Sequence, residues 1–230
     1  NGLINLGTLA VDGTVQLTTN GNGAATVVND AGLTFAASTV GGDLAATATT
    51  GNMTDSGVLT IAGTSSFTTS ANNADITLNN TNALTGAVTL STTGSTGHAT
   101  IDNGTTALNI AASSVGGNLT LTSGNASGIT DSGTVTVGGN LAATTDANNG
   151  AINMGTLAVD GTVALATNGS GNATVVNDAG LSFAASTVGG NLVATTDDND
   201  GVIDMGTLAV AGTITLTTDG SGAATIDNGT

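Results

Sequence analysis

The chain has 230 residues, a formal net charge of −16 and no lysine or arginine. Because no cationic side chain is present to neutralise phosphates, the composition argues against nucleic-acid binding and against charge-driven adhesion to anionic lipid. No apolar run approaches the roughly 20 residues that a membrane-spanning helix needs, so we expect no membrane insertion.

Short runs that alternate between apolar and polar residues recur along the whole chain. Runs of this kind, rich in Val, Leu, Ile and Thr and bounded by Gly and Asn, are typical of β-strands. In chain order they include residues 9–11, 15–17, 59–61, 119–121, 135–137, 208–210 and 214–216.

These runs belong to a repeated unit, and each unit opens on an apolar residue. The opening residues are Ile4, Val27, Met53, Ile76, Ile101, Ile129, Ile152, Val175, Ile203 and Ile226. Three short strands per unit, with Gly, Asn or Asp at the corners, predict one triangular coil of a parallel β-solenoid. We therefore predict an all-β fold of about nine to ten coils of 23–28 residues, forming one continuous repeat array over residues 1–230.

Inward-facing residues of successive coils should stack in ladders along the solenoid. One predicted ladder contains Leu17, Ala46, Phe67, Leu90, Leu121, Ala143, Leu165, Ala194 and Leu216. Both ends of the array look uncapped, and open strand edges invite pairing with a further strand. We therefore expect neighbouring repeats, or like chains placed end to end, as partners.

A longer duplication overlies the short repeat. Residues 5–43 and 153–191 are identical at 32 of 39 positions, at an offset of 148 residues. With coils of the predicted length, this offset corresponds to six coils.

Two segments carry a resemblance to a known family. These are Ile129 to Thr145, ITDSGTVTVGGNLAATT, and Asn52 to Thr69, NMTDSGVLTIAGTSSFTT. They resemble the filamentous haemagglutinin-like adhesins, which bacteria export by two-partner secretion. The resemblance implies a right-handed β-helix, an extracellular location at the bacterial surface, and a role as an extended stalk or fibre.

Few residues offer chemistry. An inverting glycosidase needs two carboxylates about 6.5–9.5 Å apart, and aspartates of neighbouring coils could supply that spacing by accident, but the chain has no aromatic platform to hold a sugar ring. We therefore expect no catalytic activity. His98 has no second histidine or cysteine near it, and we interpret it as a solvated loop residue.

One acidic cluster is a candidate calcium site, which would make Ca²⁺ the one cofactor. Asp197, Asp198 and Asp200 share a loop, Asp219 occupies the equivalent position one coil later, and Asp204 should lie one rung from Asp227. Several oxygens without a basic partner suit a hard cation. The alternative is that acidic and amide corners are structural. Six corner residues would then hydrogen-bond from coil to coil as a side-chain ladder: Asn29, Asp55, Asn103, Asp131, Asn177 and Asn228.

Together these observations favour a non-enzymatic stalk or fibre segment of a secreted bacterial adhesin, whose surface ligand the sequence does not identify. A self-assembling filament subunit is one alternative. An ice-binding solenoid is another, because three outward runs are rich in threonine and serine: Thr64-Ser66-Thr68, Asn118-Thr120-Thr122 and Thr213-Thr215-Thr217.

Overall fold

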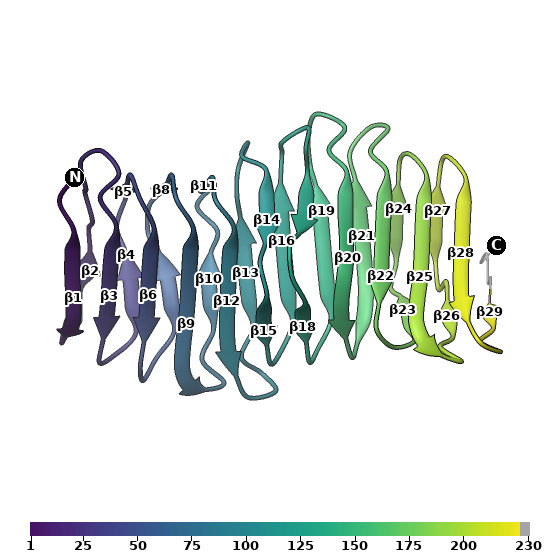
Figure 1. Ribbon diagram of the computed structural model, residues 1–230, viewed down its shortest axis with the longest axis horizontal. Helices are drawn as coiled ribbons and strands as arrows, with labels where there is room; N and C mark the ends of the chain where they lie inside the picture. The colour runs from purple at the N-terminus through teal and green to yellow at the C-terminus, as the bar shows by residue number, and fades with distance from the viewer. Residues whose placement is uncertain (226–230) are drawn as a thin grey trace.

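The computed structural model describes residues 1–225, which form an elongated stack of parallel β-strands with the first strand, β1, and the last, β29, at opposite ends of the stack (Figure 1). Every strand pair is parallel, because each strand pairs with the strands one turn before and after it. The predicted all-β parallel solenoid is confirmed. The longest strand path crosses eleven strands, so the solenoid has about eleven turns rather than nine to ten.

The first sheet has 13 strands and forms one long face of the solenoid. Eleven of them follow one another along the stack, and two more, β15 and β18, pair off this path. Its strands are β1 (Ile4–Leu9), β3 (Ala25–Asn29), β6 (Leu44–Ala48), β9 (Ser65–Asn72), β12 (Val88–Thr93), β14 (Leu108–Ile110), β15 (Ser113–Val115), β17 (Ile129–Asp131), β18 (Val135–Val137), β20 (Ile152–Val159), β22 (Ala173–Asn177), β25 (Leu192–Asn199) and β28 (Ile214–Asp219).

The second sheet also has 13 strands, and two of them, β24 and β27, lie off its main path. Its strands are β2 (Thr14–Val15), β4 (Leu33–Phe35), β7 (Met53–Asp55), β10 (Ile76–Leu78), β13 (Ala99–Asp102), β16 (Leu119–Ser123), β19 (Leu141–Thr145), β21 (Thr162–Thr167), β23 (Leu181–Phe183), β24 (Ser186–Val188), β26 (Ile203–Asp204), β27 (Leu208–Val210) and β29 (Ala224–Thr225).

A small third sheet completes the triangle in the N-terminal part of the array. It contains β5 (Ser38–Val40), β8 (Leu59–Ile61) and β11 (Ala83–Leu84). In later turns β24 and β27 lie on this side, after a strand of the second sheet, but pair within the second sheet. β15 and β18 instead follow strands of the first sheet, at the opposite edge of the solenoid, and pair within the first sheet (Figure 1).

The strand pairs give the length of one turn. Ala25 lies opposite Leu44 and Ser65 lies opposite Val88, so turns vary between about 19 and 23 residues. The predicted 23–28 residues were wrong because the opening residues do not occupy one position. Met53 lies in the second sheet and Ile129 in the first, although both begin the same local pattern. Ile226 lies outside the described residues.

The same error affects the predicted ladder and the duplication. Ala46, Phe67 and Leu90 stack in the first sheet, whereas Leu121, Ala143 and Leu165 stack in the second. The two copies of the duplication begin on β1 and β20, which are seven strand spacings apart along the first sheet, not six.

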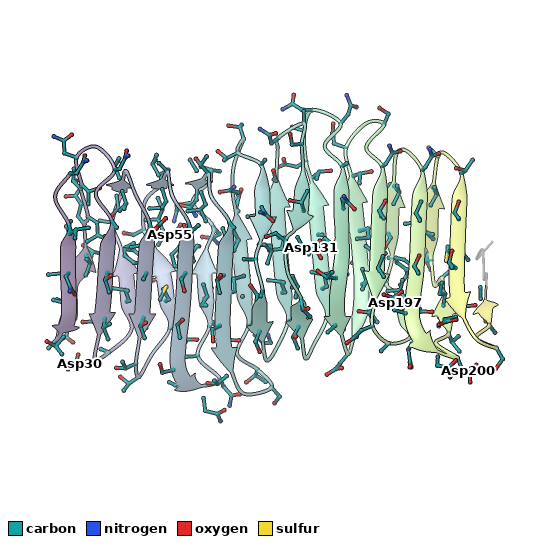
Figure 2. All side chains as sticks on the ribbon, viewed as in Figure 1. Asp30, Asp55, Asp131, Asp197 and Asp200 are labelled. Atoms are coloured by element: carbon teal, nitrogen blue, oxygen red, sulfur yellow. The ribbon has the colours of Figure 1, made fainter. Side chains whose placement is uncertain are left out.

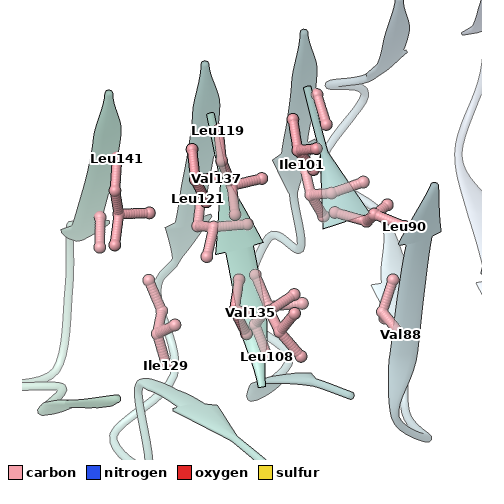
Figure 3. Packing of buried hydrophobic residues seen from close by; sticks show 14 of the residues in the cluster. Val88, Leu90, Ile101, Leu108, Leu119, Leu121, Ile129, Val135, Val137 and Leu141 are labelled. Carbon is pink, nitrogen blue, oxygen red and sulfur yellow. The ribbon is translucent and has the colours of Figure 1, made fainter. Parts of the chain in front are cut away.

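The core is one continuous apolar column between the sheets (Figure 3). Inward positions alternate with outward ones, so β6, β8 and β16 each bury every second residue. Burial of such side chains stabilises a fold by about 1.5–3 kcal/mol each before chain entropy is subtracted. Some inward positions are polar, and at one of them the Ser65 hydroxyl lies in the column between Leu44 and Val88 without a hydrogen-bond partner.

Candidate functional site

Two of the four aspartates of the candidate calcium site, Asp197 and Asp200, are labelled in Figure 2 and lie toward the C-terminal end of the stack, apart from each other. Asp197 and Asp198 belong to β25, Asp200 follows that strand, and Asp219 ends β28. All four side chains are exposed. The residue opposite Asp219 is Asn199, not Asp200.

Two of these carboxylates already have hydrogen-bond donors within the chain. Asp200 Oδ1 accepts bonds from the Ser221 backbone N–H and hydroxyl, each at 2.6 Å. These two bonds hold the pKa of the Asp200 carboxyl below its usual value. Asp219 Oδ1 accepts the Gly220 N–H at 2.8 Å.

Within residues 1–225, no group of three or more carboxylate, imidazole or thiol side chains is placed so that it could hold a metal ion. Asp204 accepts a long bond of 3.3 Å from Gly206, and its expected neighbour Asp227 lies outside the described residues. The four aspartates therefore do not converge on one point.

The two aspartates of the TDSG segments have a clear structural role. Asp131 accepts the backbone N–H groups of Gly155 and Thr156 at 2.9 and 2.7 Å, and the Thr156 hydroxyl at 2.9 Å. Asp55 accepts the N–H groups of Asn79 and Asn80 in the same way. Each carboxylate thus satisfies the irregular backbone of the next turn, where an unpaired N–H would be costly.

The corner asparagines bind backbone rather than one another. Asn29 Oδ1 accepts the Val11 N–H and its Nδ2 donates to the Val11 carbonyl, both at 2.9 Å. Asn177 does the same with Val159, and Asn103 with Leu84. The expected side-chain ladder is replaced by two-point bonds between a buried amide and the preceding turn. Asn228 lies outside the described residues.

A second series of corner residues forms a ladder that the sequence reasoning missed. A side-chain acceptor in each turn binds the backbone N–H of the equivalent residue one turn later, at 2.8–2.9 Å. The members, in order, are Asn52, Asp75, His98, Asn118, Asn140 and Thr162. We call this series the acceptor ladder. Its signal in the sequence is an acceptor side chain directly before the apolar start of a strand in the second sheet.

His98 belongs to this ladder, so its interpretation as a solvated loop residue was only partly right: it lies in the loop before β13, but its ring is bonded to the next turn. The residue is half-buried, and its imidazole Nδ1 accepts the Asn118 N–H at 2.8 Å. This role is not evident from the sequence, because a histidine occupies the position at which the other turns of the ladder have asparagine or aspartate.

The threonines also fall on faces other than those expected. Ser66 and Thr68 lie on β9 and Thr215 on β28, both in the first sheet, whereas Thr120 lies on β16 in the second. The second sheet instead contains an outward column of six paired threonines in consecutive turns: Thr14, Thr34, Thr54, Thr77, Thr100 and Thr120.

Two open surface grooves are related by the long duplication. One is lined by Gly7, Thr8, Leu9, Val28 and Asp30, and the other by the corresponding residues of the second copy. Each lies where the strand register shifts, between Leu6 and Leu9 in the first copy. The grooves therefore follow from an irregularity that both copies share.

Residues 1–225 contain no helix that is long and apolar enough to cross a membrane.

No curated protein and no solved structure matches the chain. A family model does match, over residues 22–91, 96–154 and 170–230, which together cover most of the sequence. The chain belongs to the family of repeats of unknown function (DUF5649).

Proposed function

We propose that this chain is a structural stalk or fibre segment of a secreted bacterial surface adhesin and that it performs no catalysis. The observation that carries the proposal is the unbroken connection from turn to turn along the described chain. Parallel strand pairing links β1 to β28 through every intermediate turn. A body built in this way holds whatever is attached to one end at a fixed distance from the other.

Three sets of contacts support a stiff rod. Backbone hydrogen bonds run along the long axis, the apolar column is continuous, and buried amides such as Asn177 bind the preceding turn at two points. Ten strand spacings of about 4.8 Å separate β1 from β28, which gives a length of roughly 48 Å. The resemblance of Asn52–Thr69 and Ile129–Thr145 to haemagglutinin-like repeats supports an extracellular location.

The surface charge fits a rod that stays separate from its neighbours. Sixteen aspartates and no lysine or arginine give the chain a formal charge of −16. Like charge of this size opposes side-by-side association at low ionic strength, and divalent cations would reduce the repulsion.

Immunogold electron microscopy of intact bacteria that produce the chain tests the location. The expected result is label outside the cell envelope, at a distance from it. Label confined to the cytoplasm would overturn the proposal.

Small-angle X-ray scattering tests the shape, first with calcium and then with a chelator. Two copies of the chain joined in tandem should keep the cross-section of one copy and gain about one array length. If single copies instead grow into fibres of uniform width, the filament alternative is correct. If assembly or melting temperature changes with the chelator, calcium binds.

The threonine column favours a second candidate function, ice binding. Six hydroxyl and methyl pairs repeat at one strand spacing, about 4.8 Å, on one face of the second sheet. Thr34 and Thr54 also share a hydrogen bond at 3.0 Å, which fixes their orientation. The column ends at Ala142, opposite Thr120.

Thermal hysteresis of ice growth tests this candidate. The double substitution Thr54→Lys with Thr77→Lys should abolish the activity, whereas the matched pair Thr39→Lys with Thr60→Lys, on the third sheet, should not. No hysteresis in the unmodified chain would eliminate ice binding.

A further inference from the structure

His98 differs chemically from the other members of the acceptor ladder. Its backbone N–H donates to Asp75 Oδ1 at 2.8 Å, and its Nδ1 accepts the Asn118 N–H at 2.8 Å. In the turns before and after it, the acceptor is an oxygen of Asn52, Asp75, Asn118 or Asn140. Asparagine oxygens accept hydrogen bonds at any pH at which the protein folds.

An imidazole nitrogen accepts a hydrogen bond only when it carries no proton. In neutral histidine one ring nitrogen is a donor and the other an acceptor, whereas in the charged form both are donors. The bond to Asn118 therefore requires neutral His98 with its proton on Nε2. Histidine is also the side chain whose charge ordinarily changes between about pH 5 and 8.

We propose that His98 makes this rung of the solenoid acid-labile: protonation of the imidazole breaks the bond to Asn118 and loosens the corner of the next turn. A ring flip cannot restore the bond, because the charged ring presents an N–H or a C–H in either orientation. The ring also lies directly against the turn above, since a Cβ at Gly117 would collide with Nδ1. Two N–H groups would then face each other across a short contact.

The surrounding charges do not replace the lost acceptor. The strand β13 begins directly after His98. The two strands paired with it, β10 and β16, carry no titratable side chain. Asp102, at the far end of β13, binds the Gly104 N–H at 2.8 Å. Asp75 is the one carboxylate bonded to His98, and its attraction to an imidazolium in a half-exposed corner is small and screened. It offers nothing to the Asn118 N–H.

Amide hydrogen exchange measured by NMR tests the proposal at single rungs. Between about pH 7.5 and about pH 5, after correction for intrinsic exchange, Asn118 should lose about tenfold of its protection, as expected for one lost hydrogen bond. The Asn140 amide is the internal control, because an asparagine oxygen binds it at 2.8 Å. Its protection should not follow the same pH dependence.

The matched variant is His98→Asn, which installs the acceptor that neighbouring turns use. Asn118 in this variant should stay protected at both pH values. The ¹⁵N shift of His98 Nδ1 in the unmodified chain gives an independent measurement, and should show an unprotonated Nδ1 at the higher pH. A protonated Nδ1 there, or the same pH dependence at Asn118 in both proteins, would overturn the proposal.

Discussion

The two copies of the long duplication have the same local bonds but different degrees of burial. In both, a corner asparagine binds the preceding turn, Asn29 to Val11 and Asn177 to Val159. Leu9 of the first copy is nevertheless half-buried, whereas Leu157 of the second is 1 % exposed. The difference arises because β1 has a paired strand on one side and β20 has pairs on both.

The comparison separates two contributions to stability. The residues within a pair of adjacent turns determine which hydrogen bonds form, so both copies form them. The strand stacked on the other side determines how much water is excluded. Stability in such an array approximates a sum of terms for single turns and for their nearest neighbours.

The largest expected difference between the copies concerns the leucines. Leu157→Ala should lower the free energy of unfolding by about 3 kcal/mol, and Leu9→Ala by about 1 kcal/mol, because only the first leaves a closed cavity. Urea unfolding followed by far-ultraviolet circular dichroism measures both, since the chain has no tryptophan or tyrosine. Equal losses would contradict the dependence on stacking.

The asparagines should show a smaller difference in the same direction. Asn177→Ala leaves the backbone of Val159, which is 2 % exposed, without its partner, at a cost of about 2 kcal/mol. Asn29→Ala should cost about 1 kcal/mol because the half-buried Val11 can bond to water instead. A double substitution in one chain should give the sum of the two losses, since the sites are far apart.

The serines of the third side should show no difference between the copies. Ser38 and Ser186 accept the N–H groups of Leu17 and Leu165, each at 3.0 Å, and all four residues are buried. Ser38→Ala and Ser186→Ala should each cost about 1 kcal/mol. A clear asymmetry in the unfolding free energies would show that burial is not what distinguishes the copies.

The smallest effect concerns pH and a single rung. The lowered pKa of Asp200 contributes stability above the unfolded value of 3.8, and this contribution is lost as the pH falls through the folded value. In the Asp200→Asn variant, the melting temperature should therefore fall slightly less steeply as the pH is lowered into the acid range. Asn149, whose Oδ1 accepts the Ser170 N–H at 3.0 Å, allows the reciprocal exchange. Asn149→Asp should make this fall steeper.

The strand rhythm and the parallel stacking could be predicted from the sequence because inward positions repeat with period 2 on every strand. The length of a turn could not. TDSG occurs at Thr54 in the second sheet and at Thr130 in the first, so equal local patterns do not mark equal positions around the solenoid. Pairing between turns resolves the position, and that pairing is not visible in a local pattern.

The corner residues show a similar limit. Their composition indicated hydrogen bonding between turns, which is correct. An amide can bond equally well to another amide or to backbone, and in the structure Asn29 and Asn177 bond to the backbone of Val11 and Val159. The aspartates at 197–200 are close together in the sequence, which predicted a cluster. The directions of their side chains, however, depend on the backbone conformation at the end of β25.

The duplicated segment also bears on how the array changes in length. Because residues 5–43 and 153–191 bind their neighbours through the same groups, an unequal crossover between the two coding segments would delete or add 148 residues, or seven turns. At each new junction, a copy of the segment would pair with a neighbouring turn that one of the two copies already pairs with. Rods of different length can then arise in one genetic event, without an intermediate that exposes a broken edge.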